Sequence, residues 1–460
     1  MEHRDAAIYG ARVAEVEPFG IEPIAANERH GNPGDLFGLW FSANAETATW
    51  SVGILTAALY GTSLGGAIAG ILIGNAVGYA LLGLLSTFGP RWGLPQMMQS
   101  RLAFGYYGNA APAGLSFLAG IGWFAVNSVL GAYALGTLAH LAYLPALTIM
   151  LAIQVAIVVY GYNMIHLFER LSLVALACGF VLLGLATVQR TDWLAPFDPR
   201  APLAAGGEIA GIVLALALSF SYVIGWVPAA SDYSRYLPAT TRPSAIWTWV
   251  FLGGFIPCTL LEIMGAAAVK ALPQYDLAGL QPTAAVTLLL GNGFAGRLGL
   301  ITIMLGTLTA NCLNLYSGAL SGLAAGIKMK RWQAAIFVGA IGATLATLGS
   351  RPDKTAELYT NFLLLLAAWA SPWAGVVIVH WWKTRANAAD PFAALRPFPR
   401  LRAGLIAWLV GIAASIPFLD QTWFTGWIAR SDPRLGDISY EVGFAAAAAA
   451  MLLLFRPQSA

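Results

Sequence analysis

The chain has 460 residues, of which 58% are hydrophobic and only 10% are charged, and its mean hydropathy is +0.68. A soluble domain carries about 25% charged residues, so this composition excludes an ordinary soluble protein. The net charge of +3 selects no class of partner, and nothing indicates binding to a nucleic acid polymer. The sequence therefore predicts an all-α protein that crosses a lipid bilayer many times.

Continuous apolar runs follow one another along the chain, each near the length of about 20 residues that spans a bilayer. They are too long for barrel strands, which alternate over about ten residues. The first residues lack the basic and short apolar regions of a signal peptide. We expect about twelve transmembrane helices, at residues 36–59, 63–88, 112–140, 144–164, 168–189, 207–230, 245–270, 295–326, 332–350, 356–382, 402–419 and 437–455.

Lysine and arginine are distributed unevenly between the two sides of these spans. If the N-terminus is cytoplasmic, about two thirds of the 25 basic residues fall in cytoplasmic segments, as the positive-inside rule requires. This asymmetry favours an even number of spans in an inner or plasma membrane, with both termini cytoplasmic.

Two of the expected spans are interrupted by residues that weaken a helix. The first carries Ser42, Asn44 and Glu46 in its middle, where polar side chains compete for backbone hydrogen bonds. The sixth carries Gly225 and then Pro228, which removes a backbone donor. Broken helices at corresponding positions of two halves are typical of transporters built from inverted repeats.

The positions of the breaks predict two five-helix units followed by two peripheral helices. The internal repeat is inferred from these positions, because no repeated motif is visible. The expected boundaries are an N-terminal segment at 1–35, a transport core at 36–383 with repeats at 36–190 and 207–383, a loop at 384–401, and the peripheral helices with a short tail at 402–460.

Short motifs run in order through the first eight spans. They are Gly-Ile-Glu-Pro-Ile at 20–24, Glu-Arg at 28–29, Leu-Trp-Phe-Ser-Ala-Asn at 39–44, Gly-Pro-Arg-Trp-Gly-Leu-Pro at 89–95, Ser-Arg-x-x-Phe-Gly-x-x-Gly-Asn at 100–109, Gly-Trp-Phe-Ala-Val-Asn-Ser-Val-Leu-Gly at 122–131, Ala-Ser-Asp-Tyr-Ser-Arg-Tyr-Leu-Pro at 230–238 and Asn-x-x-Asn-x-Tyr-Ser at 311–317. This set resembles the purine–cytosine permease family of nucleobase–cation symporters, in particular its fungal-type branch. The resemblance implies twelve helices with five-plus-five inverted repeats, alternating access, and uptake of a nucleobase driven by a proton or sodium gradient.

A nucleobase presents two flat faces and an edge of hydrogen-bond donors and acceptors. Trp123 and Asn127 are four residues apart, so on a helix they share one face. There the indole can cover a ring while the amide, which both donates and accepts, reaches its edge. The resemblance implies these two roles. The alternative is an interfacial tryptophan beside an asparagine that joins two helices.

The resemblance also implies a second aromatic face from the sixth span. It points to Trp226, with Tyr222 one turn earlier as the alternative. In the eighth span it assigns Asn314 to the substrate, whereas helix contact is the alternative reading. Ser42 and Asn44, at the first break, complete the expected substrate site.

The coupling cation is expected near the first break. Glu46 is a carboxyl at membrane depth, which can bind substrate, carry a proton, or instead reach a water-filled vestibule. A sodium ion would need backbone carbonyls near Ser42 and Ala45 with hydroxyls from the eighth span, where Thr307 and Thr309 are available. An adjacent Ser-Thr pair is missing there, which favours a proton over sodium.

Other function classes fit less well. No nucleophile–base pair or metal-ligand spacing is present, so neither an enzyme nor a resident cofactor or metal is expected, and a channel would favour a continuous polar stripe. The alternative substrates are allantoin or hydantoin-like rings and a pyrimidine precursor of thiamine. Glu262 in the seventh span has no motif around it, and its role stays open, as does the oligomeric state. The loop at 91–101 and residues 232–235 are interpreted as loop or gate structure.

Overall fold

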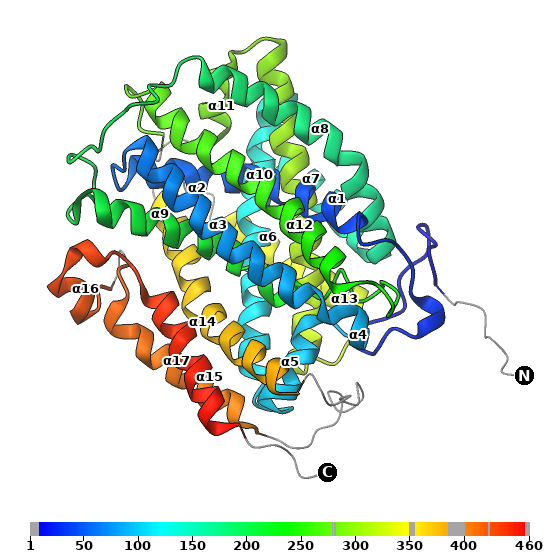
Figure 1. Cartoon of the computed structure of the whole chain (residues 1–460). Coiled ribbons are helices and arrows are strands. Elements are labelled where there is room, and N and C mark those ends of the chain that lie inside the picture. The colour runs from blue at the N-terminus through cyan, green and yellow to red at the C-terminus, as the bar shows by residue number, and fades with distance from the viewer. Residues whose placement is uncertain are drawn as a thin grey trace, which may run out of the picture.

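A computed structural model describes residues 9–277, 279, 282–348, 355–384, 401–421 and 424–455, with the side chains of 355–358 left aside. Within these ranges the regular secondary structure is helical, apart from an isolated bridge between Asp420 and Thr425 (Figure 1). The expected loop at 384–401 lies almost wholly outside the described residues. The helices are α1 (Asp35–Asn44), α2 (Thr47–Ala58), α3 (Leu64–Ser86), α4 (Phe88–Trp92), α5 (Gln96–Phe104), α6 (Ala110–Ala139), α7 (Tyr143–Tyr160), α8 (Tyr162–Val188), α9 (Gly207–Ile224), α10 (Pro243–Ala271), α11 (Pro282–Leu290), α12 (Phe294–Ala325), α13 (Arg331–Leu348), α14 (Thr355–Thr384), α15 (Ala403–Ser415), α16 (Trp427–Ser431) and α17 (Ser439–Leu454), with 3-10 turns η1 (Ala26–Glu28), η2 (Val227–Ala229), η5 (Ile416–Phe418) and η6 (Pro433–Leu435).

Each expected span corresponds to a helix or to a broken helix in the described part of the chain. Eight helices there are long and apolar enough to cross a bilayer, and α15 and α17 are shorter apolar helices. Both predicted interruptions are confirmed: the first span is divided into α1 and α2, and the sixth ends as α9 before η2.

Residues 91–101 were interpreted from the sequence as loop or gate structure, and the structure shows that the connection between α3 and α6 is partly helical. It contains α4 and α5, whose residues are nearly all buried. Gly93 adopts a left-handed conformation (φ 65°) that ends α4, and Pro95 precedes the first residue of α5. Neither helix shows an apolar run long enough to span a bilayer, so the criterion that detects transmembrane helices missed both.

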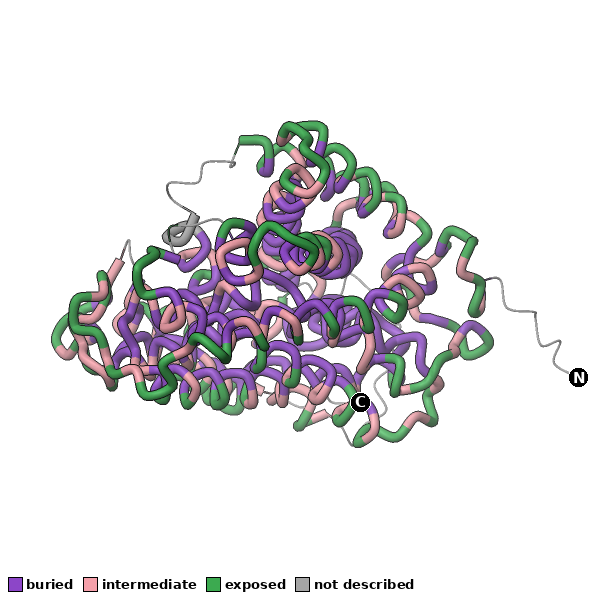
Figure 2. The backbone as a smooth tube through the Cα atoms, turned by 90° about the horizontal axis from the view of Figure 1, so that it is seen from above, coloured by how far each residue is buried: buried purple, intermediate pink, exposed green. Residues whose placement is uncertain are grey.

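Helices of one expected unit pack on helices of the other, and corresponding helices make corresponding contacts. The central helices α6 and α12 pack along each other, α3 packs on α9, and α10 packs on α1 and α2. Small residues permit this proximity, since a Cβ added to Gly120 of α6 would lie 2.9 Å from the Cα of Gly318 in α12. Figure 2 shows that buried residues are concentrated in the middle of the molecule.

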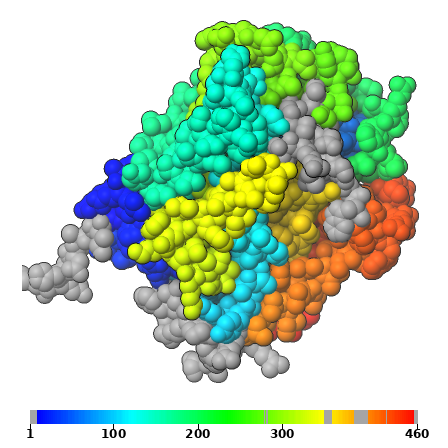
Figure 3. All heavy atoms as spheres, turned by 180° about the vertical axis from the view of Figure 1, so that it is seen from behind, coloured from blue at the N-terminus to red at the C-terminus, as the bar shows by residue number. Residues whose placement is uncertain are grey.

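The last helices lie outside these two units. α15 and α17 pack on each other and on α14, at one edge of the molecule in Figure 1. Seen from behind, the C-terminal segment (orange to red) lies to one side of α13 (yellow) (Figure 3). This position agrees with the peripheral placement expected for the last two spans.

The segment before α1 is anchored to several helices through Glu17, whose side chain is fully buried. One carboxylate oxygen accepts hydrogen bonds from Arg235 (3.0 Å), Tyr236 (2.6 Å) and Tyr316 (2.9 Å). The other oxygen accepts the backbone N–H of Tyr162 and lies 3.3 Å from the Arg331 guanidinium. The N-terminal segment thereby joins elements from both halves of the chain.

Candidate functional site

The break between α1 and α2 leaves main-chain groups without intrahelical partners. Ala45 and Glu46 leave the helical conformation, and Glu46 is fully extended (φ −138°, ψ 169°). Two threonine hydroxyls satisfy carbonyls of the last α1 turn: Thr49 Oγ1 donates to Asn44 O (2.8 Å), and Thr309 Oγ1 lies 3.0 Å from Ser42 O. A side-chain network from α2 and α12 therefore supports the unwound segment.

Glu46 projects from this break into the buried centre, where Tyr222 of α9 meets it. Tyr222 Oη donates to Glu46 Oε1 (2.9 Å) and lies 2.7 Å from Thr49 Oγ1. Glu46 Oε2 has no hydrogen-bond partner among the described residues, although it is buried. The first and sixth spans thus meet through a carboxyl that retains one unused acceptor.

Trp123 lies in an aromatic cluster next to Tyr222. Its ring makes edge contacts with Tyr222 (5.5 Å between centroids), Tyr359 (5.9 Å) and Phe362 (5.2 Å). Tyr359 and Phe362 belong to α14 and were not singled out in the sequence, because isolated aromatics in an apolar span resemble packing residues. Three helices, α6, α9 and α14, therefore contribute aromatic side chains to one cluster.

Trp226 follows the second break and packs on a different ring. It lies edge to face with Trp40 of α1, at 5.8 Å between centroids, and is 5% exposed. The backbone brings it near Trp123, since a Cβ added to the preceding Gly225 would lie 3.4 Å from Trp123 Nε1. Of the two aromatic candidates in this span, Tyr222 contacts Trp123 directly and Trp226 extends the cluster towards α1.

Asn127 is the polar residue of α6 that faces this group. Its side chain is fully buried and lies beside the Glu46 carboxyl. Neither its Oδ1 nor its Nδ2 makes a hydrogen bond within the part of the chain that the structure describes. A buried amide with unused donor and acceptor groups is costly unless a ligand or water completes it.

The other candidate side chains at the first break have partners already. Asn44 donates to Trp40 O (2.7 Å) and accepts from Tyr79 Oη (2.8 Å). Ser42 Oγ donates to the backbone carbonyl of Glu169 (2.8 Å). Both side chains therefore join α1 to neighbouring elements.

The two asparagines of α12 occupy a polar layer against α6. Asn311 Nδ2 lies within hydrogen-bonding distance of Phe124 O (3.1 Å) and Ser128 Oγ (3.1 Å). Asn314 Nδ2 donates to Asn311 Oδ1 (3.3 Å), and Asn314 is 4% exposed. Asn311 therefore joins α12 to α6, whereas Asn314 makes one long hydrogen bond, to Asn311, among the described residues.

The candidate cation ligands divide into two groups. Thr309 reaches the carbonyl of Ser42, and the carbonyl of Ala45 approaches Gly306, one turn earlier on α12. The hydroxyl of Thr307 bonds the backbone of its own helix (2.9 Å to Met304 O) and faces α6, away from the break. The structure brings Ser42, Ala45 and Thr309 together and leaves Thr307 apart.

Two further buried carboxyls lie in the membrane-spanning part. Glu262 accepts hydrogen bonds from Asn75 (2.9 Å) and from the Cys258 thiol (3.3 Å), which explains its burial. Glu169 of α8 is 1% exposed, and neither carboxylate oxygen has a partner among the described residues. Sequence reasoning missed Glu169 because it lies at the start of a span, beside Arg170, where charged residues are ordinary.

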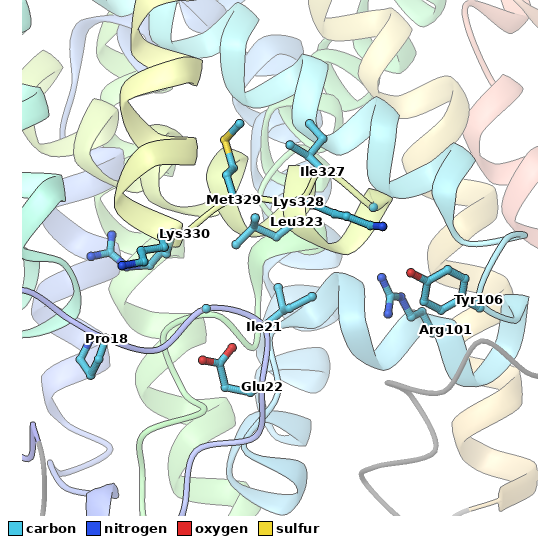
Figure 4. A pocket seen from close by; sticks show the side chains of 13 residues that line it. Pro18, Ile21, Glu22, Arg101, Tyr106, Leu323, Ile327, Lys328, Met329 and Lys330 are labelled. Atoms are coloured by element: carbon cyan, nitrogen blue, oxygen red, sulfur yellow. The ribbon is translucent and has the colours of Figure 1, made fainter.

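A separate surface pocket of about 460 Å³ lies between the N-terminal segment and the connection from α12 to α13. Figure 4 shows Ile21 and Glu22 on one side and Leu323, Lys328 and Lys330 on the other. It shares no lining residue with the group around Trp123 and Glu46. The buried polar and aromatic group, rather than this pocket, is the candidate substrate site.

The family model described as "Permease for cytosine/purines, uracil, thiamine, allantoin" matches residues 23–443. The chain belongs to this permease family. Its members are membrane transporters, so this permease is a multi-pass membrane protein and not an enzyme. The resemblance inferred from the sequence motifs is confirmed.

Curated relatives cover nearly the whole permease. The purine-cytosine permease fcyB of Emericella nidulans is 28% identical, over 95% of this chain and 88% of the relative. The purine-cytosine permease FCY2 of Saccharomyces cerevisiae is 26% identical, over 93% of this chain and 83% of the relative. Fungal proteins are therefore among its relatives, in agreement with the resemblance to the fungal-type branch.

A solved structure shares the fold of this permease. It is MHP1, described as a nucleobase-cation-symport-1 family transporter in a closed conformation with bromovinylhydantoin bound. The TM-score is 0.76 at 20% identity, and the match covers 95% of each chain. The predicted fold class, a helical transporter of five-plus-five inverted repeats with two peripheral helices, is confirmed.

Proposed function

We propose that this permease imports a nucleobase, cytosine or a purine, by symport with a cation through alternating access, and that the cation is a proton. The observation that carries the substrate proposal is the amide of Asn127, which lies one turn after Trp123 on α6 and beside the Glu46 carboxyl; neither this amide nor Glu46 Oε2 has a hydrogen-bond partner among the described residues. A flat ring with donors and acceptors on its edge would satisfy both polar groups while stacking on aromatic side chains.

The proposed substrate contacts follow from this group. Trp123 covers one face of the ring, and Tyr222 or Trp226 approaches the other. Asn127, Glu46 and Asn314 bind the edge. Ser42 and Asn44, whose side chains already join α1 to its neighbours, hold the unwound segment in place.

The proton proposal rests on the first break. A sodium ion at this place would draw on the Ser42 and Ala45 carbonyls and on hydroxyl oxygens of α12. Thr309 lies within hydrogen-bonding distance of Ser42 O, and Thr307 faces away from the break. From α12, the hydroxyl of Thr309 alone would join the carbonyls of Ser42 and Ala45, which makes a poor sodium site. The Glu46 carboxyl, which can carry a proton, lies at the same break.

The proposal also divides the chain into a transport core and peripheral helices and assigns the side of the membrane on which its termini lie. We assign the transport core to residues 36–383, with repeats at 36–190 and 207–383, and the peripheral helices to 402–460. The uneven distribution of basic residues supports cytoplasmic termini in an inner or plasma membrane.

A second substrate class comes from the comparisons. The family description includes thiamine and allantoin, and MHP1 carries a hydantoin. Allantoin, hydantoins and a pyrimidine precursor of thiamine are also flat and polar, so the same geometry accommodates them. They differ from nucleobases in the pattern of edge groups that Asn127 and Glu46 would meet.

A thermal-shift panel on the purified protein tests the proposal. Cytosine, adenine, guanine, hypoxanthine, uracil, allantoin and a pyrimidine thiamine precursor are added separately to wild type and Trp123→Ala. Stabilisation of wild type by a nucleobase, lost in the variant, is expected. Stabilisation by allantoin or the thiamine precursor alone would replace the substrate class, and no stabilisation by any compound would contradict the proposed site.

A further inference from the structure

The strongest unexplained feature is the carboxyl of Glu169 in α8. Its side chain is 1% exposed, and neither Oε1 nor Oε2 has a hydrogen-bond partner among the described residues. Glu262, the comparable carboxyl of α10, accepts two hydrogen bonds and needs no further partner. An unsatisfied carboxyl at this depth costs free energy and is a functional-site candidate.

Glu169 lies against the last turn of α1, next to the proposed coupling region. Ser42 Oγ donates to the Glu169 carbonyl (2.8 Å), and the Ser42 carbonyl lies 3.0 Å from Thr309 Oγ1. Helix α8 also packs on α12. One chain of contacts therefore links Glu169 to the break that presents Glu46.

No cation compensates this carboxyl in the described part of the chain. The titratable groups that face it are Glu46 at the break, Cys312 of α12 and Tyr233 after η2. None of these is positively charged, and Tyr233 Oη is already bonded to Leu313 O and Ser317. Ionisation would place a negative charge without a compensating cation in a low-dielectric interior, which strongly disfavours the ionised form.

We propose that Glu169 is the binding site of the transported proton, distinct from Glu46, which contacts the substrate. This inference rests on the proposed symport. In the conformation seen here the carboxyl is neutral and holds the proton. When the site opens to the cytoplasm, the O–H bond of Glu169 breaks, the proton joins a water molecule, and a hydrated carboxylate remains.

The separation of roles explains why two carboxyls lie near the same break. Glu46 has one oxygen bonded to Tyr222, and its other oxygen has no hydrogen-bond partner among the described residues, so a substrate edge can use it. Neither oxygen of Glu169 has a hydrogen-bond partner among the described residues, so hydration would be enough to let it exchange its proton. Mutual repulsion between the two carboxylates favours at least one of them neutral at any time.

The test reconstitutes the full chain in liposomes and compares Glu169→Gln with Glu262→Gln, a matched buried carboxyl. Two assays are run on each: counterflow of labelled substrate without a gradient, and accumulation driven by a pH gradient with proton movement recorded. Glu169→Gln should retain counterflow and lose both accumulation and proton movement. Glu262→Gln should retain all three.

Accumulation and proton movement at wild-type levels in Glu169→Gln would overturn the inference, as would their loss in Glu262→Gln instead. Absence of counterflow in wild type with every heterocycle tested would instead contradict the proposed function. If Glu169→Gln fails to fold, the inference is tested with Glu169→Asp, which keeps a carboxyl. Its shorter carboxyl should shift the external pH of half-maximal uptake, and an unchanged pH profile would overturn the inference.

Discussion

At the scale of single residues, the buried asparagines differ in whether their amides already have partners. Asn44 makes hydrogen bonds through both its Nδ2 and its Oδ1, whereas Asn127 makes no such bond among the described residues and only approaches the Glu46 carboxyl. Both are polar residues in apolar spans, so the sequence predicted the same role for both. The distinction depends on Tyr79, which is distant in sequence, and could not be predicted from the motif around Asn44.

Truncation of Asn44 should reduce stability, whereas truncation of Asn127 should reduce substrate affinity. Asn44→Ala leaves the buried Tyr79 Oη without its acceptor, which should cost about 1–3 kcal/mol of stability and lower the melting temperature. Asn127→Ala removes an amide with no such partner, so the melting temperature should change little while substrate affinity falls. Thermal melts and binding isotherms on both variants test this contrast, which equal loss of stability would contradict.

Trp123 is expected to contribute stacking energy to binding. Trp123→Ala should weaken substrate binding by about 1–3 kcal/mol, the usual worth of one base–aromatic stack. Trp123→Phe should recover part of the loss because it retains a flat ring. Trp427→Ala, at a tryptophan that is 65% exposed in α16, is the control and should bind as wild type does. Unchanged substrate binding in Trp123→Ala would show that the substrate ring does not stack on Trp123.

At the scale of elements, the broken helices depend on close contacts with their neighbours. α2 lies directly on α10, and a Cβ added to Gly53 would lie only 1.7 Å from the carbonyl oxygen of Glu262. Gly265 of α10 meets α2 in the same way. Apolar length and helix-breaking residues were enough to predict the spans and both breaks. α4 and α5 were missed because short buried helices carry no such signal.

Gly53→Ala should separate α2 from α10. Overpacking of this kind costs about 1–3 kcal/mol, so the variant should melt at a lower temperature than wild type. Gly65→Ala, in α3 where no neighbour lies within 4 Å, is the matched control and should be neutral or slightly stabilising. Equal melting temperatures for the two variants would show that the α2–α10 contact is not tight.

Glu17 should hold the N-terminal segment against the helix ends. Glu17→Gln removes the charge that compensates Arg235 and Arg331, both of which are buried, and should cost about 3–5 kcal/mol. Hydrogen exchange should rise in residues 9–34 and at the start of α13. Glu15→Gln, which removes only an exposed pair with Arg12, should leave exchange unchanged. Protection equal to wild type in Glu17→Gln would contradict the anchoring role.

At the scale of the whole molecule, the two halves meet around the breaks, and the polar and aromatic group lies at this junction. Trp123, Tyr222 and Glu46 come from different spans, and α14 adds Tyr359, which the motifs did not indicate. Polar residues are rare in such spans, so the sequence could predict that the first, third, sixth and eighth spans contribute to the candidate site, but it gave no indication of α14. It could not predict the proposed role of Glu169, which rests on a carboxylate without hydrogen-bond partners among the described residues.

The central claim is active import of a nucleobase, and the most direct test is accumulation of labelled cytosine or adenine in liposomes containing the purified full chain. With an inside-alkaline pH gradient, we expect saturable accumulation above the external concentration, abolished by a protonophore and independent of sodium. Equilibration without accumulation would contradict active transport, and accumulation that requires a sodium gradient would contradict proton coupling.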